Sequence, residues 1–142
     1  MKGFTLIEVL VVVGIIIVIS ALSLPFYGKF VNMNSINSQV TEVRKNIRLA
    51  QEEAQAGKHN SNHGIHFTTT SYTHYVGSDF NSRDKNKDED YDLNNKLEFI
   101  SSFEVNFSKD TGLPSATGTI TIKNTNNGKT ADISINEEGL IY

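Results

Sequence analysis

The chain has an apolar start and a polar remainder. Between Val9 and Leu24 no residue is charged, and twelve of these sixteen residues are Val, Ile or Leu. Extended back to Phe4 across the single Glu8, the apolar stretch reaches about 20 residues, which is the length of a helix that crosses a bilayer. The pattern therefore predicts a transmembrane or filament-core helix over residues 4–25.

A second apolar pattern continues beyond Pro25, a residue that removes one backbone hydrogen bond and kinks a helix. Apolar residues recur there mainly at steps of three and four, which is typical of an amphipathic helix. Gly57 provides a helix stop. We therefore expect an amphipathic helix half over residues 26–57, with an apolar face made of Val31, Ile36, Val40, Val43, Ile47, Ala50 and Ala54.

After Gly57 the apolar period changes to two, which indicates strands. We expect a globular β-sheet domain over residues 58–142, with one face of an antiparallel sheet packed on the second half of the helix. The predicted fold class is α+β, with one long N-terminal helix and a C-terminal sheet. The predicted strands are residues 63–67, 72–76, 97–100, 103–107, 119–122 and 131–135.

Glu8 interrupts the apolar start, and an acidic side chain in hydrocarbon costs about 2.5–3.5 kcal/mol. An ordinary signal peptide with a cleavage site near Ala21-Leu22-Ser23 has only Lys2 as its positive charge. An uncleaved signal anchor fits the length of the stretch. Both interpretations leave the Glu8 carboxylate without a partner.

The segment Gly3-Phe4-Thr5-Leu6-Ile7-Glu8, with Lys2 before it and the apolar run after it, resembles the class III leader of type IV prepilins and type II secretion pseudopilins. The resemblance implies a leader over residues 1–3, cleavage between Gly3 and Phe4 by a prepilin peptidase, and N-methylation of Phe4. It also implies that Glu8 meets the terminal amine of a neighbouring subunit's first residue, here Phe4, during assembly.

Weaker similarity extends into the domain. Ala50-Gln51-Glu52-Glu53-Ala54, Gly64-Ile65-His66-Phe67 and the late segment 133–139 are similar to the GspH/FimT branch of minor pilins and pseudopilins. Some FimT-type proteins bind DNA through arginines near the terminal glycine, but here Gly139 is followed by Leu140-Ile141-Tyr142.

The resemblance implies a structural subunit of a type IV pilus or a type II secretion-like filament, and no enzyme. The expected localisation is the cytoplasmic membrane, single-pass, with the C-terminal domain outside the cytoplasm, followed by a surface or periplasmic filament. The expected partners are other pilin subunits, the prepilin peptidase, the membrane assembly platform and, before assembly, the lipid bilayer. The alternative is a minor pilin that binds a ligand or DNA in adhesion or DNA uptake.

Composition limits the other functions. The formal net charge is -3, so the chain lacks the basic excess that attracts nucleic acid, and a DNA partner is not expected. The absence of cysteine excludes disulfides, thiolate metal sites and a cysteine nucleophile. No motif of a hydrolase, a zinc protease or a phosphate-binding loop is present.

An acidic loop over residues 78–95 places oxygen-bearing side chains at alternate positions, as the first part of a calcium loop does. No cofactor is established by the sequence, and calcium is the one candidate, although Glu89 and Asn95 stand where an EF-hand has glycine and glutamate. The other interpretation is a solvated loop that its own charges keep extended. The predicted ligands are Asp84, Asn86, Asp88 and Asp90.

The four histidines, His59, His63, His66 and His74, are interpreted as surface residues. His63 and His66 are three apart, which puts them on opposite faces of a strand. The sequence shows neither a cysteine nor a suitably placed carboxylate that would complete a metal site with them.

Overall fold

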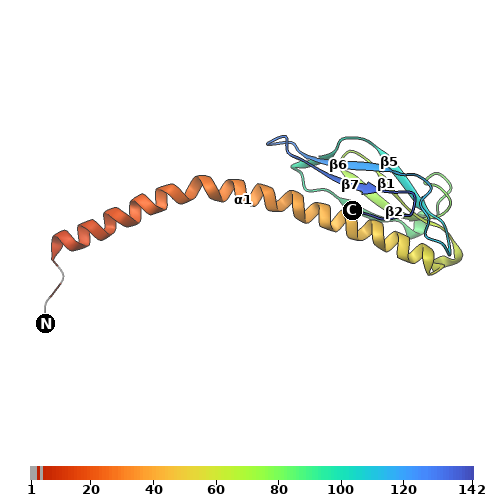
Figure 1. Ribbon diagram of the computed structural model, residues 1–142, viewed down its shortest axis with the longest axis horizontal. Coiled ribbons are helices and arrows are strands. Elements are labelled where there is room, and N and C mark those ends of the chain that lie inside the picture. Colours follow the sequence, from red (N-terminus) through yellow and green to blue (C-terminus); the bar gives the residue numbers. More distant parts are fainter. Residues whose placement is uncertain (1–2, 4) are drawn as a thin grey trace. The chain divides into compact units, whose positions relative to one another are not determined.

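The computed structural model describes residues 3 and 5–142. Helix α1 is assigned to Leu6–Gln55, and its side chains are described in two shorter stretches, residues 6–21 and 36–55. The chain forms two compact units, Met1–Asn34 and Ser35–Tyr142, so that each stretch belongs to a different unit. Figure 1 shows the helix together with the strands of the second unit.

In the first unit, α1 begins at Leu6, directly after Thr5. The backbone N–H of Thr5 donates to Oε2 of Glu8 at 3.4 Å, which is one half of the reciprocal pattern of a Thr-x-x-Glu capping box. Most of the next residues are Val or Ile, whose branched side chains give only modest helix propensity. Helix propensity alone therefore supports this stretch only weakly.

The predicted transmembrane helix over residues 4–25 is corrected by the structure. Within the described part of the chain, no helix is long and apolar enough to cross a membrane. The expectation of a single-pass membrane protein, which depended on that helix, is contradicted as well. Pro25 lies between the two described stretches, so its predicted kink falls outside the described side chains.

In the second unit, residues 36–55 of α1 present one apolar face to the strands. The buried residues on this face are spaced by seven, four, three and four positions, as a helix packed on a sheet requires. The helix is followed by Gly57, whose φ of 64° lies in the left-handed region that favours glycine at this position. The buried apolar residues are Ile36, Val43, Ile47, Ala50 and Ala54.

The strands form two antiparallel sheets. The first has the order β3-β2-β1-β5, and the second has the order β4-β6-β7. Two short 3-10 helices, η1 (Lys58–Asn60) and η2 (Lys85–Lys87), precede β1 and β3. The strands are β1 (His63–Phe67), β2 (Ser71–Val76), β3 (Glu89–Asp92), β4 (Leu97–Phe99), β5 (Phe103–Phe107), β6 (Gly118–Asn124) and β7 (Thr130–Ile135).

One continuous hydrophobic core joins residues 36–55 of α1 to both sheets. Within this core, Phe67 of β1 and Phe99 of β4 are in contact, with ring centroids 5.1 Å apart in an edge-to-face arrangement. Because these two rings come from different sheets, the core holds the sheets together through aromatic contacts.

The six predicted strands are present, with ends within two residues of the prediction, and residues 36–55 pack on strands as expected. The fold class is nevertheless wrong as predicted. The described helical side chains fall in two shorter stretches in two units, and the strands form two sheets instead of one. A seventh strand, β3, lies inside the segment that the sequence predicts as an acidic loop.

Candidate functional sites

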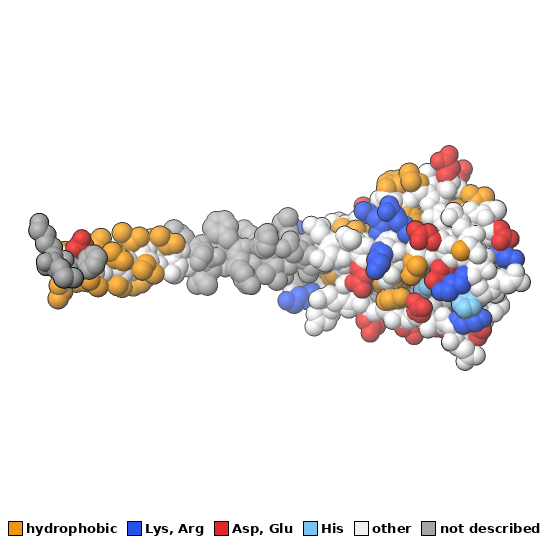
Figure 2. All heavy atoms as spheres, turned by 90° about the horizontal axis from the view of Figure 1, so that it is seen from below, with side chains coloured by type: hydrophobic (Ala, Val, Ile, Leu, Met, Phe, Trp, Pro, Cys, Tyr) orange, Lys and Arg blue, Asp and Glu red, His pale blue; other side chains and the backbone are white. Residues whose placement is uncertain are grey.

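The most unusual surface of the molecule is the apolar helical stretch of the first unit. Twelve large apolar side chains between Leu6 and Ile19 are between 47% and 80% exposed. Figure 2 shows hydrophobic side chains covering the visible face of this stretch. Water-exposed apolar surface of this extent marks a binding surface, since a helix that is hydrophobic all round is normally buried.

Glu8 is the one charged residue of this stretch. Its Oε2 accepts from both the backbone N–H and the hydroxyl of Thr5, each at 3.4 Å. These contacts are long and local, so they leave the carboxylate available to a stronger donor from another molecule. Of the predicted processing residues, Gly3 is exposed, with no atom within 4 Å of a Cβ built on it, while Phe4 lies outside the described residues.

The structure gives the predicted calcium ligands other partners. Asp88 forms an ion pair with Arg83 at 2.8 Å, and Asp84 forms one with Lys87 at 3.1 Å. Asp90 accepts from the hydroxyl of Thr73 at 2.6 Å. Asn86 donates its backbone N–H to Asp84, which caps η2 and whose pKa is lowered chiefly by the hydrogen bond with Lys87. The structure offers no cluster of these side chains to support calcium, so the calcium site stays a prediction from sequence.

The interpretation of all four histidines as surface residues is wrong for two of them. His63 on β1 and His74 on β2 are buried, and Glu53 of α1 lies against both. Oε2 of Glu53 is 3.3 Å from Nδ1 of His63 and 3.8 Å from Nε2 of His74. The two imidazole nitrogens are 3.2 Å apart. Among the described residues, this is the one group of three or more His, Cys, Asp and Glu residues whose ligand atoms converge.

Each imidazole in this group has a further contact on its other nitrogen. Nε2 of His63 is 3.0 Å from the backbone oxygen of Lys58, and Nδ1 of His74 is 4.0 Å from a carboxylate oxygen of Glu89. Burial lowers the pKa of His74, and the neighbouring Glu53 carboxylate opposes this shift only in part. At neutral pH, the neutral imidazole of His74 is therefore favoured over the protonated form.

A signal for this group is present in the sequence. His63 alternates with Ile65 and Phe67, and His74 alternates with Tyr72 and Val76, so both histidines belong to the apolar face of their strand. The third member could not be found in this way, because Glu53 comes from the helix and only the packing of the helix on the strands brings it near.

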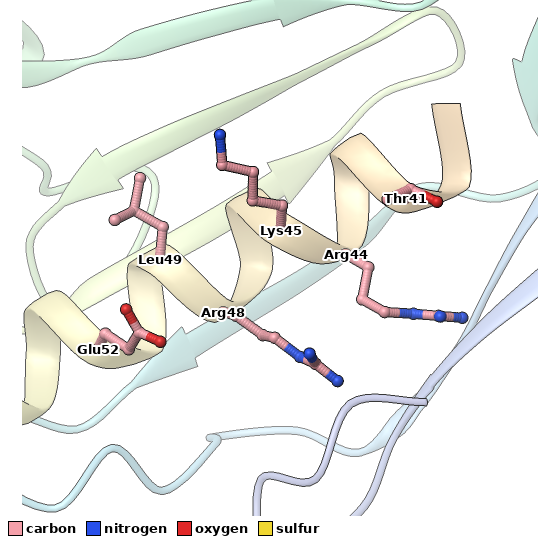
Figure 3. Close-up of a pocket in the computed structure, with 6 residues that line it drawn as sticks. All are labelled: Thr41, Arg44, Lys45, Arg48, Leu49 and Glu52. Carbon is pink, nitrogen blue, oxygen red and sulfur yellow. The ribbon is translucent and has the colours of Figure 1, made fainter. Parts of the chain in front are cut away.

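A basic hollow lies beside α1 in the second unit, lined by Thr41, Arg44, Lys45, Arg48, Leu49 and Glu52. Figure 3 shows Arg44 and Arg48 extending from the same side of the helix. Arg48 donates to the backbone oxygen of Ile141 at 2.9 Å, and Glu52 adds a negative charge to the lining. Three cations with one carboxylate do not make the extended basic surface that nucleic acid requires, so nothing here favours the DNA-binding alternative.

Comparison with known proteins gives no relative for the chain: no family model matches it, and searches of curated proteins and of solved structures find no match.

Proposed function

We propose that the chain is a structural filament subunit similar to type IV pilins and type II secretion pseudopilins. In this proposal, cleavage between Gly3 and Phe4 produces the mature subunit. Other copies of the chain, or related subunits, then cover the apolar stretch of α1. The observation that supports the proposal is the exposed apolar helix, which directly follows the leader-like sequence and contains a single carboxylate.

Burial of the apolar stretch supplies the driving force for assembly. A fully buried Val, Leu or Ile side chain contributes about 1.5–3 kcal/mol relative to an exposed one. For the twelve exposed side chains between Leu6 and Ile19, the gross contribution is at most about 18–36 kcal/mol before the cost of association. A bundle of such helices is therefore strongly favoured over the isolated helix in water.

Glu8 would set the position of one subunit against the next. A carboxylate that becomes buried in an apolar bundle is heavily penalised unless a cation pairs with it. Cleavage after Gly3 creates such a cation, because the new amino group of Phe4 stands at the start of the same apolar segment. Pairing of Glu8 with the amine of a neighbouring subunit satisfies both charges.

The first prediction concerns processing. We expect the mature chain to begin at Phe4, with its amine methylated, because Gly3 is the glycine directly before the apolar stretch. Mass spectrometry of N-terminal peptides from filament material measures this directly. A chain that begins at Met1, or after Ser23, would contradict the proposal.

The second prediction concerns the charge of Glu8. We expect Glu8→Gln to lower the amount of subunit in sheared filaments by more than about tenfold, since unpairing a buried charge costs about 3–5 kcal/mol. Glutamine keeps a side-chain oxygen for the helix start, as in a capping box. The variant therefore removes the charge and leaves the local acceptor in place. Immunoblots of filament and whole-cell fractions give the ratio.

Two control variants separate assembly from helix stability. Glu42→Gln removes an exposed carboxylate from the second-unit part of α1 and should leave the ratio unchanged. Thr5→Ala removes the hydroxyl that donates to Glu8, with an expected cost to the helix of about 1 kcal/mol. Normal incorporation of Glu8→Gln would show that the charge does not determine assembly.

A further inference from the structure

We propose that Glu53, His63 and His74 bind one divalent transition metal, with zinc as the best fit, through Oε2 of Glu53, Nδ1 of His63 and Nε2 of His74. The inference does not depend on the proposed filament function. It rests on the distances within the group, on the burial of the two histidines and on the contacts behind the ligands.

The distances suit tetrahedral zinc. Nitrogen and oxygen ligands at about 2.0–2.1 Å from zinc lie about 3.3–3.4 Å from one another in a tetrahedron. The three observed separations are 3.2, 3.3 and 3.8 Å. An ion can therefore be placed among the three atoms with side-chain adjustments of a few tenths of an ångström.

The hydrogen bond behind His63 directs the other ring nitrogen to the group. The Lys58 backbone oxygen, 3.0 Å from Nε2 of His63, can only accept, so Nε2 donates to it. Nδ1 of His63 is therefore turned toward Oε2 of Glu53 at 3.3 Å and toward Nε2 of His74 at 3.2 Å. A metal ion placed among these three atoms would bind all of them at once.

The contacts behind the ligands follow the pattern of metal sites. A histidine that binds a metal usually donates its other N–H to a backbone carbonyl or a carboxylate, which orients the ring. Here the Lys58 carbonyl serves His63, and Glu89 stands 4.0 Å from Nδ1 of His74. The second oxygen of Glu53 is held by the ammonium of Lys58. His63 and Glu53 therefore have partners that fix their orientation, whereas the Glu89 carboxylate is near His74 but beyond hydrogen-bond distance.

The site would connect helix α1 to the two paired strands β1 and β2. Glu53 lies near the C-terminal end of α1, and the histidines lie on the paired strands β1 and β2. A bound ion would link the end of the helix to the sheet, in the way that structural zinc ions stabilise small domains. Two imidazoles and one carboxylate suit zinc and its first-row neighbours, whereas calcium prefers oxygen ligands.

The test uses the purified full chain in detergent, freed of metal by chelator and then titrated with zinc chloride by calorimetry. We expect one zinc ion per chain and a higher melting temperature in zinc than in chelator. Cobalt(II) should give the intense visible absorption of a tetrahedral site, and this signature does not depend on stability. Binding of no zinc, or an octahedral cobalt spectrum, would overturn the proposal.

Variants assign the ligands. Glu53→Gln and His74→Gln should weaken zinc binding by about 100-fold or more, because loss of even an outer-shell partner costs about 10–100-fold. The matched controls are Glu52→Gln, at the adjacent and exposed helix position, and His66→Gln, on the same strand as His63 but on its other face. Circular dichroism in chelator shows whether each variant folds. Equal affinity in folded Glu53→Gln and Glu52→Gln would overturn the assignment, even where His74→Gln fails to fold.

Discussion

Replacement of Phe67 by alanine is expected to lower the free energy of unfolding of the second unit by about 3–5 kcal/mol. Phe67 is fully buried on β1, and its ring lies 5.1 Å from Phe99, 5.7 Å from Tyr72 and 6.4 Å from Phe103 between centroids. Because Phe99 belongs to the other sheet, the cavity would open where the two sheets meet. The aromatic neighbours are themselves held by packing, so they can fill the cavity only in part.

Urea denaturation of the full chain, followed by near-ultraviolet circular dichroism of the tyrosines, measures this loss. Ile100→Ala is the control, because Ile100 is apolar, adjacent to Phe99 and 57% exposed. Its substitution should change the free energy of unfolding by no more than about 0.5 kcal/mol. A loss below about 1 kcal/mol for Phe67→Ala would contradict the expected contribution of Phe67 to the core.

Substitution of Gly64 by alanine is expected to cost about 2–4 kcal/mol, from overpacking and from displaced hydrogen bonds. A Cβ at Gly64 would stand 2.7 Å from Cε1 of Tyr75, and nearer still to the end of that ring. Tyr75 pairs with Gly64 across β1 and β2 and is fully buried. Its hydroxyl donates to Glu104 at 2.7 Å and accepts from Asn106 at 3.2 Å. The ring therefore cannot move aside without losing these bonds.

A double-mutant cycle with Tyr75→Leu tests the proposed clash. In the Tyr75→Leu background, Gly64→Ala should cost less than about 1 kcal/mol, because the ring that the methyl group meets is gone. If Gly64→Ala costs the same free energy of unfolding in both backgrounds, the glycine is needed for its backbone conformation and not to make room for the Tyr75 ring.

The strands were predictable because their apolar residues alternate, as in Phe103, Val105 and Phe107. Alternation identifies the buried face of a strand but not the strand it pairs with. It could therefore not show that β4 pairs with β6 in a second sheet. Strand β3 escaped prediction for a different reason. It is an edge strand whose residues, Tyr91 apart, are exposed acids, and such a strand has no apolar pattern to detect.

The candidate sites also differ in how far the sequence could predict them. Glu8 could be singled out from the sequence because a lone charge in an apolar run is visible without a structure. The group of Glu53, His63 and His74 depends on the crossing of a helix over a strand pair, which no local spacing encodes. In the acidic segment, local spacing suggested a contact that the fold does not show. The sequence places Asp84 and Asp88 as ligands of one calcium ion, but in the structure each carboxylate forms an ion pair with its own basic residue.

The acidic edge strand also limits how copies of the chain can associate. Strand β3 ends the first sheet and carries Glu89, Asp90 and Asp92. In the part of the chain that the structure describes, no further strand pairs with its outer edge. A second copy that added its own β3 to this edge would bring carboxylates against carboxylates, and this repulsion blocks sheet-to-sheet growth. Association through the open β edge is thereby disfavoured, as charged edge strands disfavour amyloid-like aggregation.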